Sequence, residues 1–197
     1  MFLLTKPALP AIEQFLIDSS SDKFSYPEIG ATKSNSAPPG YNIDHNRVKL
    51  GSGPAAFERA KSAIIGWKMF DLDWVELIVD NTPIEIDQTV AILVHHFSFY
   101  SLNAARIVYT LDEAENFGFA YGTLTEHGEI GEERFSVEID PKSGEVWYDL
   151  YAFSRPVSLL ALAGYPLSRH LQKSFARDSK RAMFNAVSDS PSTPQNS

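Results

Sequence analysis

The sequence predicts an α+β fold in which a strongly curved antiparallel β-sheet of about seven strands wraps around a long C-terminal α-helix. Residues 74–153 alternate between pieces rich in Val, Ile and aromatic residues and short turn signals, which is typical of consecutive strands. The turns are too short to contain crossover helices, so neighbouring strands must be antiparallel. Residues 167–187 carry apolar side chains at four-residue spacing, which indicates a helix with one face packed on the sheet.

Residues 1–40 are predicted to form a helix and an extended arm that packs on the body of the protein. The helix, about Pro10–Ile17, has a narrow apolar face and ends at a run of serines. The prolines and glycines that follow exclude regular structure, but Tyr26, Ile29 and Tyr41 could fix the arm to the body.

Residues 41–187 are predicted to form the main domain. Its first strand is Asn42–Leu50, and Gly51–Pro54 then turns the chain into a short helix that extends to about Trp67. A turn is also predicted at Ser101–Asn103. The remaining strands are predicted at Trp74–Val79, Val90–Tyr100, Ala105–Leu111, Phe117–Leu124, Arg134–Ile139 and Val146–Phe153.

The C-terminal helix is predicted in two parts. A short apolar segment, Val157–Gly164, is followed by a break at Tyr165–Pro166 and a long amphipathic segment. Residues 188–197, rich in Ser and Pro, are predicted to be a disordered tail. The apolar stripe that should face the sheet consists of Leu167, Leu171, Phe175, Ala182 and Ala186.

Period-2 alternation assigns side chains to the two faces of the predicted sheet. A strand with bulky rings on one face and only small side chains on the other is expected to pack its rings into a core. The face with small side chains can then be approached closely by another element or can border an empty space. The clearest case is the strand in which Phe117, Phe119 and Tyr121 oppose Gly118, Ala120 and Gly122.

Composition and charge exclude several classes of protein. The net charge of −8 and the pI near 5.1 argue against a general nucleic-acid or anionic-membrane binder. The absence of cysteine excludes disulfides and thiolate chemistry. No stretch approaches the ~18 apolar residues of a membrane span, and the start lacks the pattern of a signal peptide. We therefore expect a soluble, cytoplasmic protein.

The C-terminal helix is locally basic. Residues 155–187 carry six Lys or Arg against Asp178 alone, and Asp178 is expected to pair with Arg177 or Arg181. Two explanations remain open. The cations could complement the helix dipole on a solvated face, or they could bind an anion or a lipid headgroup.

Several motifs in order resemble a known family. The resemblance covers nearly all of residues 10–187 and is to the family called domain of unknown function 1990, of the START-like or pollen-allergen-like helix-grip (SRPBCC) superfamily. It implies a curved sheet that grips a long C-terminal helix around a hydrophobic cavity, and it implies no catalytic residue. The motifs are Tyr26–Thr32, Pro39–Tyr41, Phe57–Ala60, Trp67–Phe70, Phe117–Thr123, Gly131–Phe135 and Phe153–Pro156.

Three polar features could belong to a site. His95 and His96 point to opposite faces of a strand, so they cannot hold one metal ion together, and we expect no metal site. Glu133 shares the inner face with Phe135 and could act as a general acid or base at the mouth of the cavity, or simply be solvated.

Asp149 lies among aromatic residues, and Arg106 lies in an otherwise apolar strand. The two could form a structural ion pair, or they could orient the polar end of a ligand. The full set of candidate cavity residues is His95, Arg106, Tyr109, Phe119, Tyr121, Glu133, Phe135, Asp149, Tyr151, Leu171 and Phe175.

The preferred hypothesis is a non-enzymatic protein that binds a small hydrophobic or amphipathic molecule between the sheet and the C-terminal helix, without a cofactor. One alternative is an enzyme of the cyclase, hydratase or isomerase type that uses a cavity carboxylate. Another is an interaction or peripheral-membrane protein that acts through the basic helix. The sequence leaves the oligomeric state open.

Overall fold

A single antiparallel sheet of eight strands organises the computed structural model, which describes residues 1–35, 38–78, 83–125, 129–156 and 165–188. The strand order is β2-β8-β7-β6-β5-β4-β3, and the short β1 pairs with β5 outside this path. The strands are β1 (Phe2–Leu3), β2 (Asn42–Ser52), β3 (Val75–Ile78), β4 (Thr89–His95), β5 (Tyr100–Asp112), β6 (Asn116–Thr123), β7 (Glu129–Ile139) and β8 (Glu145–Pro156).

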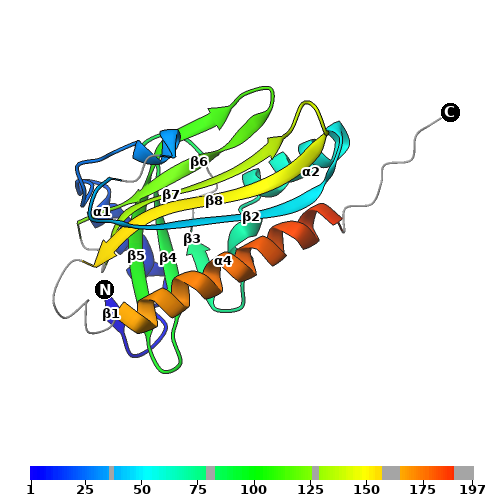
Figure 1. Ribbon diagram of the computed structural model, residues 1–197. Helices are drawn as coiled ribbons and strands as arrows, with labels where there is room; N and C mark the ends of the chain where they lie inside the picture. The colour runs from blue at the N-terminus through cyan, green and yellow to red at the C-terminus, as the bar shows by residue number, and fades with distance from the viewer. Residues whose placement is uncertain (36–37, 79–82, 126–128, 157–164, 189–197) are drawn as a thin grey trace.

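The sheet curls so that β4 and β5 run steeply across the direction of β2 and β8 (Figure 1). Two register shifts accompany this curvature, one between Lys49 and Gly51 and one between Ile107 and Tyr109. An extra residue on one strand bends it and increases its twist. The predicted curved antiparallel meander is confirmed, and the structure shows that β2 joins it by pairing with its last strand, β8.

The inner face of the sheet, defined as the face toward the C-terminal helix, is covered by three elements (Figure 1). These are α2 (Pro54–Ile65), the short helix η2 (Lys68–Phe70) and α4 (Tyr165–Ser188). Together with the sheet they bury the largest apolar core of the protein. This arrangement confirms the predicted helix gripped by a sheet.

The outer face, on the opposite side, is covered by the N-terminal residues. The helix α1 (Leu9–Ser19) packs Ile12 and Phe15 on β4 and β5. The arm that follows crosses β6, β7 and β8 and contains one helical turn, η1 (Ala31–Ser34). Because both faces are covered, outward-pointing side chains of the central strands are buried.

The structure corrects the predicted boundary between two strands, β4 and β5, and shows one strand, β1, that was not predicted. The predicted strand Val90–Tyr100 is wrong, because β4 ends at His95 and a tight turn closes with a hydrogen bond from His96 N–H to Phe99 O of 2.8 Å. Tyr100 already belongs to β5, so the predicted turn at Ser101–Asn103 is also wrong. The turn contains no glycine or proline, which is why sequence signals missed it. The short β1 was not predicted.

Two predictions fall on residues outside the described parts of the chain. These are the apolar segment Val157–Gly164 and, except for Ser188 at the end of α4, the disordered tail. The long helix begins at Tyr165, with Pro166 as its second residue, where the missing N–H of proline is tolerated. None of the helices that the structure describes is long and apolar enough to cross a membrane.

Candidate functional site

Aromatic rings from the sheet, η2 and α4 meet on the inner face. Phe119 and Phe135 are stacked with ring centroids 5.3 Å apart. The ring of Phe70 lies 5.4 Å from Phe135, 5.4 Å from Phe175 and 6.2 Å from Tyr121. Phe70 therefore occupies the centre of the space between the sheet and α4. The structure brings four of the predicted cavity residues together here.

Two carboxylates of neighbouring strands lie on this inner face, Glu133 on β7 and Asp44 on β2, and Asp44 is paired with Arg169 of α4. Glu133 is half-buried and pairs in register with Ala152 and Tyr121. The Tyr121 hydroxyl donates a hydrogen bond of 2.7 Å to Glu133 Oε2. Burial, and then the neighbouring Glu133 carboxylate, raise the pKa of Tyr121 well above its ordinary value. Tyr121 is therefore a neutral donor, and it places the Glu133 carboxylate beside the aromatic rings of the inner face.

α4 is fixed alongside β8 at two points. Gln172 Nε2 donates to Ser154 Oγ at 3.1 Å, and the hydroxyls of Tyr148 and Ser179 are 2.8 Å apart. In the register of β7 with β8, Glu133 lies between these two points. The predicted residues Leu171 and Phe175, one helical turn apart and both half-buried, lie on the matching stretch of α4.

The buried face of α4 differs from the predicted apolar stripe. The buried residues include Ser179, Met183 and Val187, whereas Ala182 and Ala186 are only half-buried. The stripe prediction missed Ser179, because this polar residue interrupts the apolar pattern; its hydroxyl is satisfied in the core by Tyr148. The side chain of Leu167 lies outside the described part.

The cations of α4 are mostly engaged within the protein. Arg169 forms an ion pair with Asp44 on β2. Arg177 Nε lies 3.0 Å and Arg181 Nη2 3.8 Å from Asp178 Oδ1, so Asp178 pairs with both predicted partners. Lys180 Nζ donates to Asn46 Oδ1 at 3.2 Å. This arrangement favours the structural explanation of the basic helix.

Four predicted cavity residues lie on the outer face, away from α4. Arg106 donates to the backbone carbonyls of Ser19, Ser20 and Asp22, and so holds the end of α1. Arg106 and Asp149 therefore have separate partners, and the structure shows neither the ion pair between them nor a shared position on the inner face. Tyr109 binds the hydroxyl of Thr32 at 2.7 Å, Tyr151 donates to the carbonyl of Asn35, and Asp149 binds Arg134, Arg47 and His45.

The outer-face residues form a buried ionic cluster that sequence reasoning missed. Glu132 accepts hydrogen bonds from the Tyr26 hydroxyl at 2.6 Å, from the Gly30 N–H at 2.7 Å, and from the N–H of Thr32 at 3.0 Å and its hydroxyl. Arg134 donates to the Thr32 carbonyl at 2.9 Å. Glu132 and Arg134 thus share the outer face, and each binds the arm.

The far side of the cluster reaches solvent through β2. Asp149 is buried and lies 2.8 Å from Arg134 Nη2, 3.0 Å from Arg47 Nε and 2.7 Å from His45 Nε2. These three partners compensate the buried charge of the Asp149 carboxylate and occupy both of its oxygens. Asp149 is therefore a structural anchor of the outer face.

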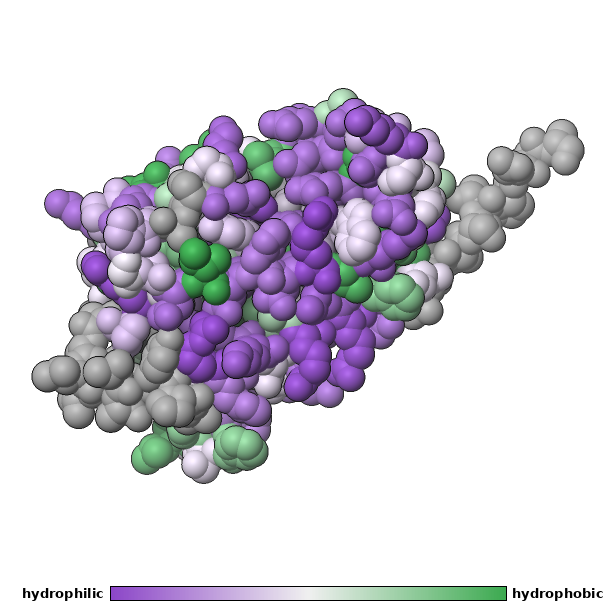
Figure 2. All heavy atoms as spheres, in the orientation of Figure 1, coloured by the Kyte–Doolittle hydropathy of each residue, from purple (hydrophilic) through white to green (hydrophobic). Residues whose placement is uncertain are grey.

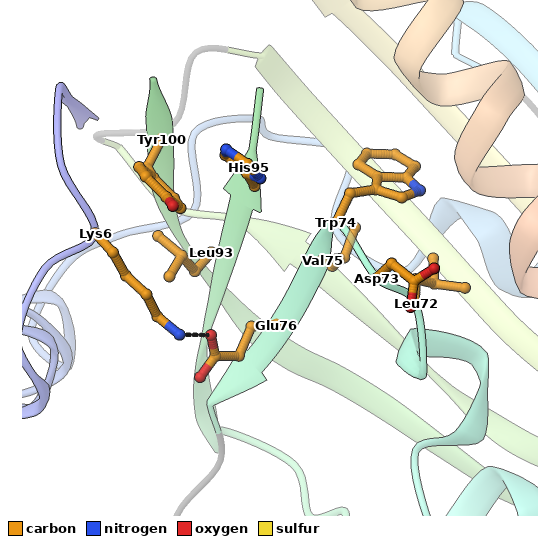
Figure 3. Close-up of a pocket in the computed structure, with 9 residues that line it drawn as sticks. All are labelled: Lys6, Leu72, Asp73, Trp74, Val75, Glu76, Leu93, His95 and Tyr100. Carbon is orange, nitrogen blue, oxygen red and sulfur yellow. Dashed lines mark ion pairs between the residues drawn. The ribbon is translucent and has the colours of Figure 1, made fainter. Parts of the chain in front are cut away.

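His95, the remaining predicted cavity residue, is exposed and lies at a surface pocket of about 310 Å³ at the edge of the sheet (Figure 3). Its ring stacks on Tyr100 at 4.6 Å, and the neighbouring Lys6 forms an ion pair of 2.6 Å with Glu76. The pocket is separate from the inner-face rings. Within the described residues, no group of three His, Asp or Glu side chains could hold a metal ion.

Comparison with known proteins agrees with this architecture. A hypothetical protein from Helicobacter pylori has a TM-score of 0.52 at 13% identity, with 84% of this chain and 94% of that chain covered. A point mutant of norcoclaurine synthase from Thalictrum flavum, in complex with a transition state analogue, has a TM-score of 0.51 at 11% identity, with 78% and 98% covered. At these identities the likeness shows the fold alone.

Sequence relatives identify the family. A UPF0548 protein of Dictyostelium discoideum is 36% identical over 207 residues, which cover 95% of this chain and 96% of that protein. Residues 25–182 match the family described as Domain of unknown function (DUF1990). The predicted resemblance is confirmed, and the chain belongs to the DUF1990 family.

Proposed function

We propose that the protein binds a small hydrophobic or amphipathic molecule between the inner face of the sheet and α4, with Glu133 orienting the polar end of the ligand. The observation that carries the proposal is the position of Glu133. It is a half-buried carboxylate beside a wall of rings, and it accepts a hydrogen bond from the Tyr121 hydroxyl. An apolar site with a few convergent polar groups is the usual chemistry of a small-molecule site.

The rings restrict where such a ligand can lie. Phe70 fills the centre of the inner face, in contact with rings of both the sheet and α4. The ligand therefore belongs at the level of Glu133, Leu171 and Phe175, toward the N-terminal half of α4. Leu171 and Phe175 are only half-buried there, although apolar side chains of a helix face normally bury fully against a core.

A carboxylate that orients a ligand favours a polar end that donates hydrogen bonds or carries positive charge. Tyr121 adds a hydroxyl that already donates to Glu133 and can also accept a hydrogen bond. The preferred ligand is thus an aromatic or aliphatic molecule with a hydroxyl or amine at one end. A fatty-acid carboxylate would be repelled by Glu133, and we expect it to bind more weakly.

A thermal-shift screen tests the proposal with a matched pair of variants. Glu133→Gln and Glu138→Gln make the same change on the same strand, but Glu138 points to the outer face and pairs with Arg47 at 2.8 Å. Amines and alcohols with apolar bodies should raise the Tm of the wild type and of Glu138→Gln, and raise that of Glu133→Gln much less. Equal shifts in both variants would exclude Glu133 from the site.

An enzymatic use of the same site is the second candidate, and the hydrogen bond between Tyr121 and Glu133 favours it. A carboxylate and a phenol in contact can accept and return a proton at a bound substrate. Carbon-13 NMR of the Glu133 carboxyl group distinguishes the two candidates. Titration of Glu133 as an ordinary exposed carboxylate would rule out the general base and leave the binding function in place.

A further inference from the structure

The hairpin that joins β4 and β5 carries an aromatic side chain at its apex. The turn is closed by the 2.8 Å hydrogen bond between His96 N–H and Phe99 O, which leaves Phe97 and Ser98 at the corner. Phe97 is 96% exposed, so almost its whole ring is in water. An apolar ring held at the apex of a rigid hairpin contributes nothing to the core and needs another explanation.

The N-terminal strand extends this apolar surface. Phe2 on β1 is 73% exposed and contacts the ring of Phe99 at 5.8 Å, and Leu4 is 87% exposed. Figure 2 shows apolar residues at the lower end of the molecule, where Figure 1 places β1 and the β4–β5 hairpin. We call the four residues Phe2, Leu4, Phe97 and Phe99 the apolar tip.

The size and shape of the apolar tip are unsuited to a stable protein interface. Its three most exposed side chains present on the order of 500 Å², whereas a standard interface buries roughly 800 Å² on each partner. Phe97 also projects from a turn, whereas hot-spot residues of protein interfaces lie in packed surroundings near the centre of a patch. A projecting ring inserts into a soft apolar phase without needing a complementary pocket.

The charges around the tip also fit a lipid surface. Residues 89–111, which contain β4, the turn and all of β5 except its last residue, Asp112, at the end away from the turn, include no Asp or Glu. Two carboxylates line the pocket beside His95: Glu76 is paired with Lys6 at 2.6 Å, and Asp73 is exposed to solvent. Around the turn lie His95, His96 and Tyr100, which have apolar rings and polar atoms and suit the headgroup level. No carboxylate of the hairpin would therefore have to be desolvated.

We propose that the apolar tip inserts into the boundary between headgroups and acyl chains of a lipid surface. The attraction is hydrophobic, so zwitterionic phosphatidylcholine suffices and added salt does not weaken it. This contact differs from one through the basic helix, because Arg169, Arg177, Lys180 and Arg181 are engaged within the protein. It also stands independently of the ligand site on the inner face.

Vesicle sedimentation tests the proposal with two matched variants. Phe97→Ser removes the ring at the apex and should lower partition into phosphatidylcholine vesicles about tenfold or more. The control is Phe184→Ser, which makes the same change near the C-terminal end of α4, outside the apolar tip. The ring of Phe184 is 45% exposed, and this variant should partition as the wild type does. Circular dichroism confirms that both variants are folded.

Because the chain has no cysteine, a single label gives a second readout that keeps Phe97 in place. Ser98→Cys, labelled with an environment-sensitive fluorophore, should brighten and shift to the blue on phosphatidylcholine vesicles, while labelled Ser188→Cys at the end of α4 should not change. The proposal is overturned if the wild type ignores these vesicles, if binding disappears in high salt, or if Phe97→Ser instead converts a dimer to a monomer.

Discussion

Replacement of Glu132 tests whether the outer-face ionic cluster holds the N-terminal arm on the sheet. In the wild type this buried carboxylate accepts hydrogen bonds from Tyr26, from Gly30, and from both the N–H and the hydroxyl of Thr32. Glu132→Gln keeps the size of the side chain but removes its charge. The amide group can accept from only part of this set, and its NH₂ faces groups that are themselves donors.

The size of the effect follows from the hydrogen bonds that are lost. A hydrogen bond to a charged group contributes about 1.5–3 kcal/mol, and about two of the bonds to Glu132 cannot be remade. The loss of stability is limited, because in the variant the arm can detach from the sheet and its amides can then bind water. We expect the free energy of unfolding to fall by about 3 kcal/mol.

Urea unfolding followed by circular dichroism measures this change, and Glu138→Gln is the control. Glu138 lies on the same strand and the same outer face, but its ion pair with Arg47 is partly exposed, so its loss should cost less than about 1 kcal/mol. Hydrogen exchange should also accelerate at the amides of Gly30 and Thr32 in Glu132→Gln. If the two variants were equally stable, the cluster would not hold the arm.

Three further changes probe the same face. Asp149→Asn should cost about 3–5 kcal/mol in urea unfolding, because it leaves the buried Arg134 without its anion; a cost below about 1 kcal/mol would contradict this. Burial raises the pKa of Tyr109 from 10.0 to about 12, so its contribution to stability is complete below pH 10 and is lost as the pH rises toward about 12. Tyrosinate absorbance should show this late ionisation coinciding with unfolding, and ionisation of every tyrosine near 10 in the folded protein would refute it. Gly122→Ala would place a Cβ 2.1 Å from the hydroxyl of Tyr26, so it should cost about 1–3 kcal/mol and loosen the arm; unchanged thermal stability would count against this packing.

The inner face could be predicted from sequence because alternation is a strong signal there. Phe119 and Phe135 lie at period-2 positions of their strands, and both are buried beneath helices as expected. Glu133 follows from the same rule, since it is two residues before Phe135. The gripping helix was predicted from its apolar spacing. The buried stripe differs from the predicted one because it includes the polar residue Ser179, whose hydroxyl is hydrogen-bonded to that of Tyr148.

The outer face could not be predicted in the same way. Glu132 and Arg134 occupy the polar positions of an alternating strand, which normally indicates exposure to solvent. They are buried because an irregular arm, with no periodicity of its own, lies across them. One signal pointed to this arrangement. Gly122 leaves room on the outer face, and Tyr26 of the arm fills it.

The same limit explains the misplaced site residues. Asp149 and Arg106 were chosen because charges among apolar residues suggest a site, but the arm and α1 provide their partners from distant parts of the sequence. Alternation also could not place Tyr109 on the same face as Arg106, because β5 contains a register shift between Ile107 and Tyr109. Such a shift changes the alternation within a strand.

Native mass spectrometry of the protein isolated from its own cells tests the central claim most directly, which is that the space beside Glu133 and α4 holds a small molecule. Gentle ionisation should show one molecule bound per chain, and the bound fraction should fall sharply in Glu133→Gln but not in Glu138→Gln. A wild-type mass equal to that of the polypeptide alone, together with no response to any apolar amine or alcohol, would contradict the account.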